Sequence, residues 1–309
     1  MWQAVCRAGV ILCAIGFFTP AAHAQGFLEG RETLGQARLF TNDLIGDGRD
    51  RWRSGAYGVS AVRGPGWDGY LPMRMGEIME YRFRGEVITP ASIVNPAPGD
   101  RLYAGVLSVG AHTHFGWNGA EVALGADIVA MGEQTGVRHL QEVVHDVFSL
   151  QSSRVESFQV DNGIYLHGTA EIGREFSFGP GRVRPFVELQ AGVETLARVG
   201  FDVTLGNYGL GGLRLRDVTT GHRISAIDSE QDFGLSLMLG GDYAWVDSSR
   251  YLPSDRGYMP EDTRYRLRAG MNYAFGYSNI FYGLTYLSEE FVGQSEGQTV
   301  GSLTIALEF

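Results

Sequence analysis

The chain has 309 residues and a formal net charge of −10, and 44 of its residues are glycine. Its basic side chains are all arginine, with no lysine, and this acidic balance argues against nucleic acid as a partner. No apolar run approaches the ~18 residues that a membrane-spanning helix needs. The sequence therefore excludes a helical membrane protein.

The first 24 residues have the pattern of a secretory signal. A single positive charge, Arg7, precedes an apolar run, and the small-residue end Ala22-His23-Ala24 suits cleavage before Gln25. Both cysteines lie within this segment, so the mature chain would contain no thiol for a disulfide, a metal or nucleophilic catalysis. We therefore expect residues 25–309 to form the mature protein as one domain.

Residues 263–275 show the clearest two-residue alternation. Apolar and aromatic side chains occupy one face of the expected strand, and the other face carries Arg264, Arg266 and Arg268. A charge on the lipid face near the bilayer midplane costs roughly 2–4 kcal/mol. We therefore expect the three arginines to face a polar lumen.

The C-terminal segment alternates in the same way and ends on an aromatic residue, Phe309. In this it resembles outer-membrane barrels, whose last strand is read by the assembly machinery. Similar segments predict about a dozen strands, at residues 36–45, 55–64, 74–88, 101–116, 119–131, 158–177, 182–198, 200–217, 231–246, 263–275, 278–289 and 296–309.

Such strands should close into an antiparallel transmembrane β-barrel in the bacterial outer membrane, because lipid cannot satisfy an unpaired strand edge. Single-chain bacterial barrels have even strand numbers. We expect an all-β fold of twelve strands, with ten or fourteen as alternatives. A soluble sandwich of this length would need a second core or domain, and no linker is present.

Polar side chains gather where the first expected strand ends. Asn42 and Asp43 are followed by Asp47 and Asp50 among glycines, and such oxygen ligands suit a hard cation such as calcium. The spacing is not that of an EF-hand. The alternative is a polar turn at the barrel rim.

Residues 132–148 interrupt the alternation. Thr135 can cap a short helix, and apolar residues between Val137 and Phe148 recur at three- and four-residue steps. Gln141 and His145 would share one face, where a neutral imidazole could take a proton from water and the amide could hold a neighbouring group. The alternative is an ordinary solvated face.

Two further pairs carry potential chemistry. Asp100 and Arg101 open a strand, where they could form a salt bridge or a phosphate clamp. His112 and His114 are two apart on a strand and share one face. With no evident third ligand for zinc, we expect both histidines to line the lumen.

In this order behind a signal peptide, the motifs resemble the outer-membrane lipid A 3′-O-deacylase family. Asn42-Asp43 matches the Asn-Asp that ends the family's first strand, and Asp50–Gly55 matches Asp-x-x-Tyr-Thr-Asn-Gly with one residue fewer. Asp100–Gly105 matches Asp-Arg-Pro-Tyr-Ala-Gly with leucine for proline. Gly132–Thr135 and Gln141–His145 match Gly-Pro-x-Ser and Gln-x-x-x-His.

The resemblance implies a twelve-stranded barrel with a short helix on the extracellular side and a calcium-dependent site that removes an acyl chain from lipid A of lipopolysaccharide. His145 would be the general base on water, while calcium polarises the ester carbonyl. The resemblance also implies roles for four other positions: Asn42 and Asp43 hold the cation, Gln141 positions water or substrate, and Arg101 meets a phosphate or developing charge. Arg53 stands where the family has a site threonine, and Ser54 is the candidate replacement.

Two other classes remain open. The first is a non-catalytic barrel: a small pore, a scaffold or an inactive homologue. In such a barrel the helix of residues 132–148 would serve only as a plug. An outer-membrane phospholipase would share the location and calcium use, but would need a serine nucleophile beside a histidine.

Overall fold

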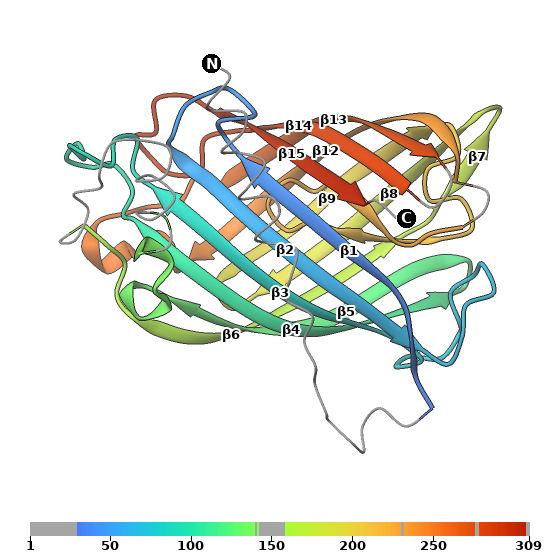
Figure 1. Cartoon of the computed structure of the whole chain (residues 1–309). Helices are drawn as coiled ribbons and strands as arrows, with labels where there is room; N and C mark the ends of the chain where they lie inside the picture. Colours follow the sequence, from blue (N-terminus) through green and yellow to red (C-terminus); the bar gives the residue numbers. More distant parts are fainter. Residues whose placement is uncertain (1–29, 140, 142–157, 230–231, 276–277, 307–309) are drawn as a thin grey trace.

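The computed structural model describes residues 30–139, 141, 158–229, 232–275 and 278–306. The predicted signal peptide of residues 1–24, the proposed base His145 and the terminal Phe309 lie outside the described residues. Strands dominate the described part (Figure 1). No helix within it is long and apolar enough to cross a membrane.

Twelve strands of the described chain form one closed antiparallel barrel. Each pairs with its neighbour, and the circle closes where β15 pairs with β1, as between Leu303 and Phe40. Figure 1 shows these two strands side by side. The barrel strands are β1 (Glu32–Asn42), β2 (Trp52–Gly64), β3 (Ile78–Thr89), β4 (Ala104–Trp117), β5 (Ala120–Met131), β6 (Gly163–Gly173), β8 (Gly181–Ala191), β9 (Glu194–Leu205), β12 (Gly234–Ser249), β13 (Thr263–Phe275), β14 (Ser278–Leu287) and β15 (Gln298–Ala306).

The predicted barrel of twelve strands is confirmed, but the bounds of two predicted strands, 182–198 and 200–217, are wrong. The chain turns at Gly192, whose φ of 131° suits a residue without a Cβ, and β9 then runs on to Leu205. The predicted strands at 182–198 and 200–217 are therefore β8 and β9, and residues 213–216 leave the barrel wall. A three-residue strand, β7 (Phe176–Phe178), extends the turn before β8.

Residues 206–229 instead fold into the lumen as a hairpin of β10 (Leu213–Arg216) and β11 (Arg223–Ile227). The hairpin passes so close to β1 that a Cβ added at Gly35 would lie 1.9 Å from the carbonyl oxygen of Ala226. Its apolar residues form a core with inward-facing residues of the wall, namely Ala37, Leu39, Val62, Ile78 and Phe281.

The lumen is polar and ionic, as the alternation predicts. Arg264, Arg266 and Arg268 are at most 9% exposed, and the last two bind Asp242 inside the barrel. Arg216 of the hairpin binds Glu171 and Asp202 of the wall. Apolar side chains of the wall strands point outward and are exposed, among them Val109, Ile128, Leu166, Leu189, Leu239, Leu267, Met271 and Tyr273.

The loops differ between the two ends of the barrel. Connections 43–51, 90–103, 132–162, 250–262 and 288–297 lie at the end opposite the start of β1 and the end of β15. In barrels of this kind the longer loops face the cell exterior. We call these five the extracellular loops; the loop of 250–262 contains the short helix η3 (Ser254–Arg256).

Candidate functional site

Asn42 and Asp43 stand where β1 ends at the extracellular rim. The Asn42 side chain accepts a hydrogen bond from the amide of Leu44 at 2.8 Å and donates to the carbonyl of Ser54 at 2.8 Å. The carbonyl of Asp43 accepts from the amides of Gly46 and Gly48, both at 2.9 Å. The polar residues that follow β1 thus fold the chain tightly against the start of β2.

The Asp43 carboxylate is only 1% exposed. Its Oδ2 accepts a hydrogen bond from the backbone amide of Arg51 at 2.8 Å. Burial, with a smaller effect of the neighbouring carboxylates of Asp50 and Asp47, nevertheless raises the pKa of Asp43 to about 8. The ionised form of Asp43 therefore lacks a compensating positive charge.

The nearest arginine side chain does not supply that charge. Arg51 directs its guanidinium away, to Asp47 at 3.1 Å and to Glu296 at 2.7 Å. Ser54 donates from Oγ to Asp50 at 2.6 Å. The Asp43 carboxylate thus has two other carboxylates near it, while the guanidinium of Arg51 is bound to Asp47 and Glu296.

The residues at this rim fit a hard cation in donor chemistry. Asn42, Asp43 and Ser54 supply amide, carboxylate and hydroxyl oxygens, the ligand types that calcium takes. A cation beside Asp43 would also offset the burial that raises the pKa of Asp43. Within the described residues, however, no three histidine, cysteine, aspartate or glutamate side chains converge to hold a metal by themselves.

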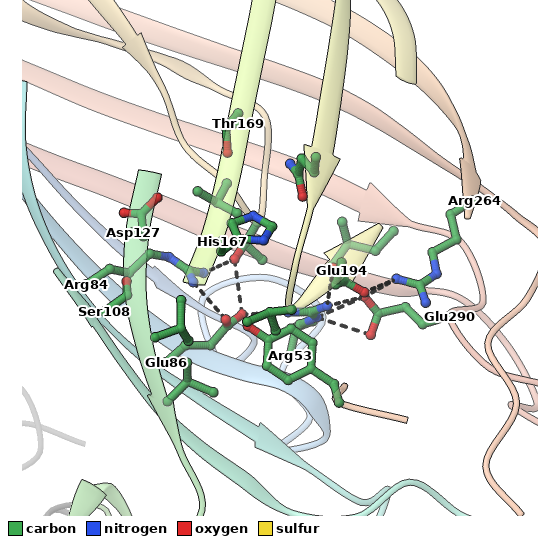
Figure 2. A pocket seen from close by; sticks show the side chains of 18 of the residues that line it. Arg53, Arg84, Glu86, Ser108, Asp127, His167, Thr169, Glu194, Arg264 and Glu290 are labelled. Carbon is green, nitrogen blue, oxygen red and sulfur yellow. Dashed lines mark hydrogen bonds and ion pairs between the residues drawn. The ribbon is translucent and has the colours of Figure 1, made fainter. Parts of the chain in front are cut away.

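A second cluster lies at the extracellular mouth of the lumen, around Arg53 and Glu290. Figure 2 shows Arg53 with Glu86 on one side and Glu290 on the other, and both pairs are ion pairs with 2.8–2.9 Å separations. Arg53 and Arg101 hold the pKa of Glu290 well below its usual range, against the effect of burial. The cluster joins β2 and β3 to the last extracellular loop.

Arg101 belongs to this cluster rather than to a pair with Asp100. Its side chain is 1% exposed and binds the carboxylate of Glu290. Burial lowers the pKa of Arg101, and the charge of Arg53 adds to the effect. Asp100 instead accepts from two backbone amides, those of Arg101 at 2.8 Å and Ala91 at 2.6 Å.

Only part of the predicted helix at 132–148 is described. It begins with the short helix η2 (Glu133–Thr135), and residues 137–139 and 141 are also helical. The Thr135 hydroxyl accepts from the amide of Val137 at 3.4 Å, but Gly136, with a φ of 68°, separates Thr135 from the helical residues that it was expected to cap. Gln141 is 9% exposed, and its predicted partner in function, His145, lies outside the described residues.

The two strand histidines line the lumen, as predicted. His112 contacts Asp127 at 3.0 Å and His114 contacts Glu80 at 2.9 Å, and all four side chains are buried. Each imidazole is therefore one half of a pair with a carboxylate, placed on the inner face of β4.

The comparison with family models gives one match, to "Outer membrane protein LpxR", over residues 10–309. The chain belongs to the LpxR family of outer-membrane proteins. The resemblance predicted from its motifs is thereby confirmed, together with an outer-membrane location. Curated protein sequences gave no match to this chain.

One solved structure supports the fold. LpxR from Salmonella typhimurium matches with a TM-score of 0.73 at 16% identity, over 89% of this chain and 100% of that one. The β-domain of the Bordetella autotransporter BrkA matches with a TM-score of 0.42 at 12% identity, over 87% of this chain and 96% of that one. At such identities the first match shows the fold alone.

In this LpxR family member, the motifs Asn42-Asp43 and Asp50–Gly55 are held in place by residues that could not be identified from the sequence. Glu86 and Glu290 neutralise Arg53, and Gln298 binds the backbone on both sides of Trp52. Glu290 and Gln298 follow Arg53 by 237 and 245 residues. No spacing pattern connects them to Asp43, and only closure of the barrel brings β15 beside β1.

The last extracellular loop also carries the run Gly293-Gln294-Ser295-Glu296-Gly297. In α/β-hydrolases a Gly-x-Ser-x-Gly run forms a sharp strand-to-helix turn that presents the serine. Here it lies in the connection between β14 and β15, two strands of the barrel wall. The run therefore lacks the structural context of a nucleophile elbow.

Proposed function

We propose that the chain is a lipid A 3′-O-deacylase, a calcium-dependent ester hydrolase that releases the 3′-linked acyl or acyloxyacyl group of lipid A in the outer leaflet. Membership of the LpxR family supports the class of reaction. The observation that carries the proposal is the buried Asp43, held at the extracellular rim beside Asn42 and Ser54.

In this proposal, His145 takes a proton from the attacking water at an imidazole nitrogen, which makes the water a better nucleophile. Gln141 holds the water or the substrate beside it. Arg101, the expected contact for a phosphate or for developing charge, would reach a substrate anion only after leaving Glu290, because its side chain is buried.

Three residues would hold the cation. Asp43 contributes the carboxylate, and Asn42 and Ser54 contribute neutral oxygens. When bound, calcium would polarise the ester carbonyl and stabilise the negative charge that develops on its oxygen. The protein's own contribution is to keep the carboxylate buried and oriented by the Arg51 amide.

Release of free fatty acid tests the proposal. The mature protein, refolded in detergent, is incubated with purified lipopolysaccharide in calcium or in chelator. We expect fatty acid to appear with time only in calcium, at a rate proportional to the amount of folded barrel. No release from lipopolysaccharides of several acylation patterns, by a barrel shown to be folded from its heat-modifiable mobility, would contradict it.

A further inference from the structure

The backbone that contacts Asp43 has an unusual conformation at Trp52. The φ of Trp52 is 51°, in the left-handed region that a bulky side chain rarely adopts. The residue is also 2% exposed, and the Arg51 guanidinium lies 4.2 Å from its ring centroid. A conformation of this kind persists only where surrounding contacts hold it.

Gln298, the first residue of β15, supplies two contacts to this backbone, which also pairs with β3 at Trp52 and Arg53. Its Nε2 donates to the carbonyl of Arg51 at 2.5 Å, and its Oε1 accepts from the amide of Arg53 at 3.0 Å. One amide side chain therefore binds the backbone immediately before and immediately after Trp52. At 2% exposure, Gln298 makes both bonds without competition from bulk water.

The same backbone segment orients the Asp43 carboxylate. The amide of Arg51 donates to Asp43 Oδ2 at 2.8 Å, so the direction of that N–H depends on how Arg51 is held. The carbonyl of Arg51 is the group that Gln298 binds. A continuous path thus runs from Gln298 through Arg51 to Asp43.

The two glutamates of the preceding loop contact side chains of this segment instead, while β3 pairs with its backbone at Trp52 and Arg53. Glu296 binds the Arg51 guanidinium, and the Glu296 side chain is 52% exposed, so water and salt weaken that pair. Glu290 binds the Arg53 guanidinium. Among Glu290, Glu296 and Gln298, the side chain of Gln298 alone binds the backbone on both sides of Trp52.

We propose that Gln298 is a positioning residue for Asp43, acting through the backbone of residues 51–53. The inference rests on the proposed function only where it concerns activity. Gln298 touches no reacting atom in this account. It fixes the Arg51 amide, and the Arg51 amide fixes the carboxylate that would hold the cation.

The test compares Gln298→Met with Gln294→Met. Both changes replace an amide by an apolar side chain of similar length, one at the first residue of β15 and one in the loop before it. Gln294, however, bonds only within that loop, to the amide of Glu290 and the carbonyl of Glu296. Heat-modifiable mobility confirms that each variant is folded, and Gln298→Glu serves as a second variant because it keeps the acceptor for Arg53 but loses the donor to Arg51.

The first readout is hydrogen–deuterium exchange of a peptide spanning residues 49–55, which needs no activity. We expect faster exchange in Gln298→Met and Gln298→Glu, and wild-type exchange in Gln294→Met. The second is binding of calcium alone, where loss of such outer contacts lowers affinity on the order of 10- to 100-fold. Unchanged exchange and unchanged calcium affinity in both Gln298 variants would overturn the inference.

A double variant separates positioning from general loosening. If Gln298 acts through Asp43, Gln298→Met should lower calcium affinity and acyl release in the wild-type background and add nothing to Asp43→Asn. If Gln298→Met lowered calcium affinity and acyl release equally in the Asp43→Asn background, Gln298 would not act through Asp43. Absence of acyl release by the wild type would count against the proposed function, while the exchange result would still decide the role of Gln298.

Discussion

Arg53 donates from Nε to both carboxylate oxygens of Glu290, at 2.8 and 3.1 Å, although the two residues are 237 positions apart in the chain. The pair is buried at the extracellular mouth of the barrel. Arg53 stands where the family motif has a threonine, and a buried guanidinium there requires a carboxylate partner. Glu290 and Glu86 provide it.

Loss of Glu290 should destabilise the extracellular end. Glu290→Ala leaves Arg53 and Arg101 buried without this partner, and breaking a buried pair in this way costs about 3–5 kcal/mol. We expect a lower unfolding midpoint in urea in detergent or bilayers, with Glu289→Ala as a matched control. A midpoint within error of wild type would mean that Glu290 is not needed to neutralise the cluster.

Asp43 should make stability depend on pH when no calcium is present. Its pKa rises from 3.8 to about 8 on folding, so the protonated form is favoured in the folded state. The stabilisation is fully present below pH 3.8 and is lost as pH rises through about 8. In chelator, we expect the unfolding midpoint of wild type to fall between pH 5 and pH 8 by more than that of Asp43→Asn.

Calcium should reverse this effect at pH 8, because it stabilises the ionised carboxylate. Asp255→Asn, in the exposed turn of η3, serves as the control for general charge effects. An identical pH dependence in wild type and Asp43→Asn would show that Asp43 does not titrate in this range.

His145→Ala should abolish acyl release without unfolding the barrel. Loss of a general base lowers the rate by roughly 10²- to 10⁴-fold, whereas the twelve wall strands do not include residue 145. The measurement is the initial rate of fatty acid release beside heat-modifiable mobility. The control is His139→Ala, an exposed residue of the same stretch, and activity near wild type in His145→Ala would remove the proposed role.

The lumenal hairpin should keep the barrel closed to ions. β10 and β11 pack against the inner wall, and Arg216 binds Glu171 and Asp202. We expect no stepwise conductance from wild type in a planar bilayer, and measurable conductance when residues 211–228 are replaced by a short Gly-Ser linker. Conductance by the intact protein would favour the pore over the enzyme.

The barrel could be predicted because each wall strand has one face in lipid and the other in a polar lumen. Arg264, Arg266 and Arg268 alone were enough to orient β13. The same reasoning failed at residues 213–216, where Leu-Arg-Leu-Arg also alternates. Alternation of apolar and polar residues shows only that the two faces of a strand lie in different surroundings. A hairpin strand inside the lumen meets that condition as well as a wall strand does.

The site could be predicted only in part. Asn42 and Asp43 carry a recognisable motif at a strand end, and the structure places Ser54 against both. Glu290 and Gln298 have no motif, because their roles follow from the pairing of β15 with β1. The contact of Arg101 with Glu290 could not be foreseen for the same reason.

The most direct test of the account is fragmentation mass spectrometry of lipid A after purified lipopolysaccharide has been treated with the mature protein. We expect loss of one 3′-linked acyl or acyloxyacyl group in calcium, and no loss in chelator or with His145→Ala. Intact lipid A in every condition, or loss of a chain from another position, would contradict it.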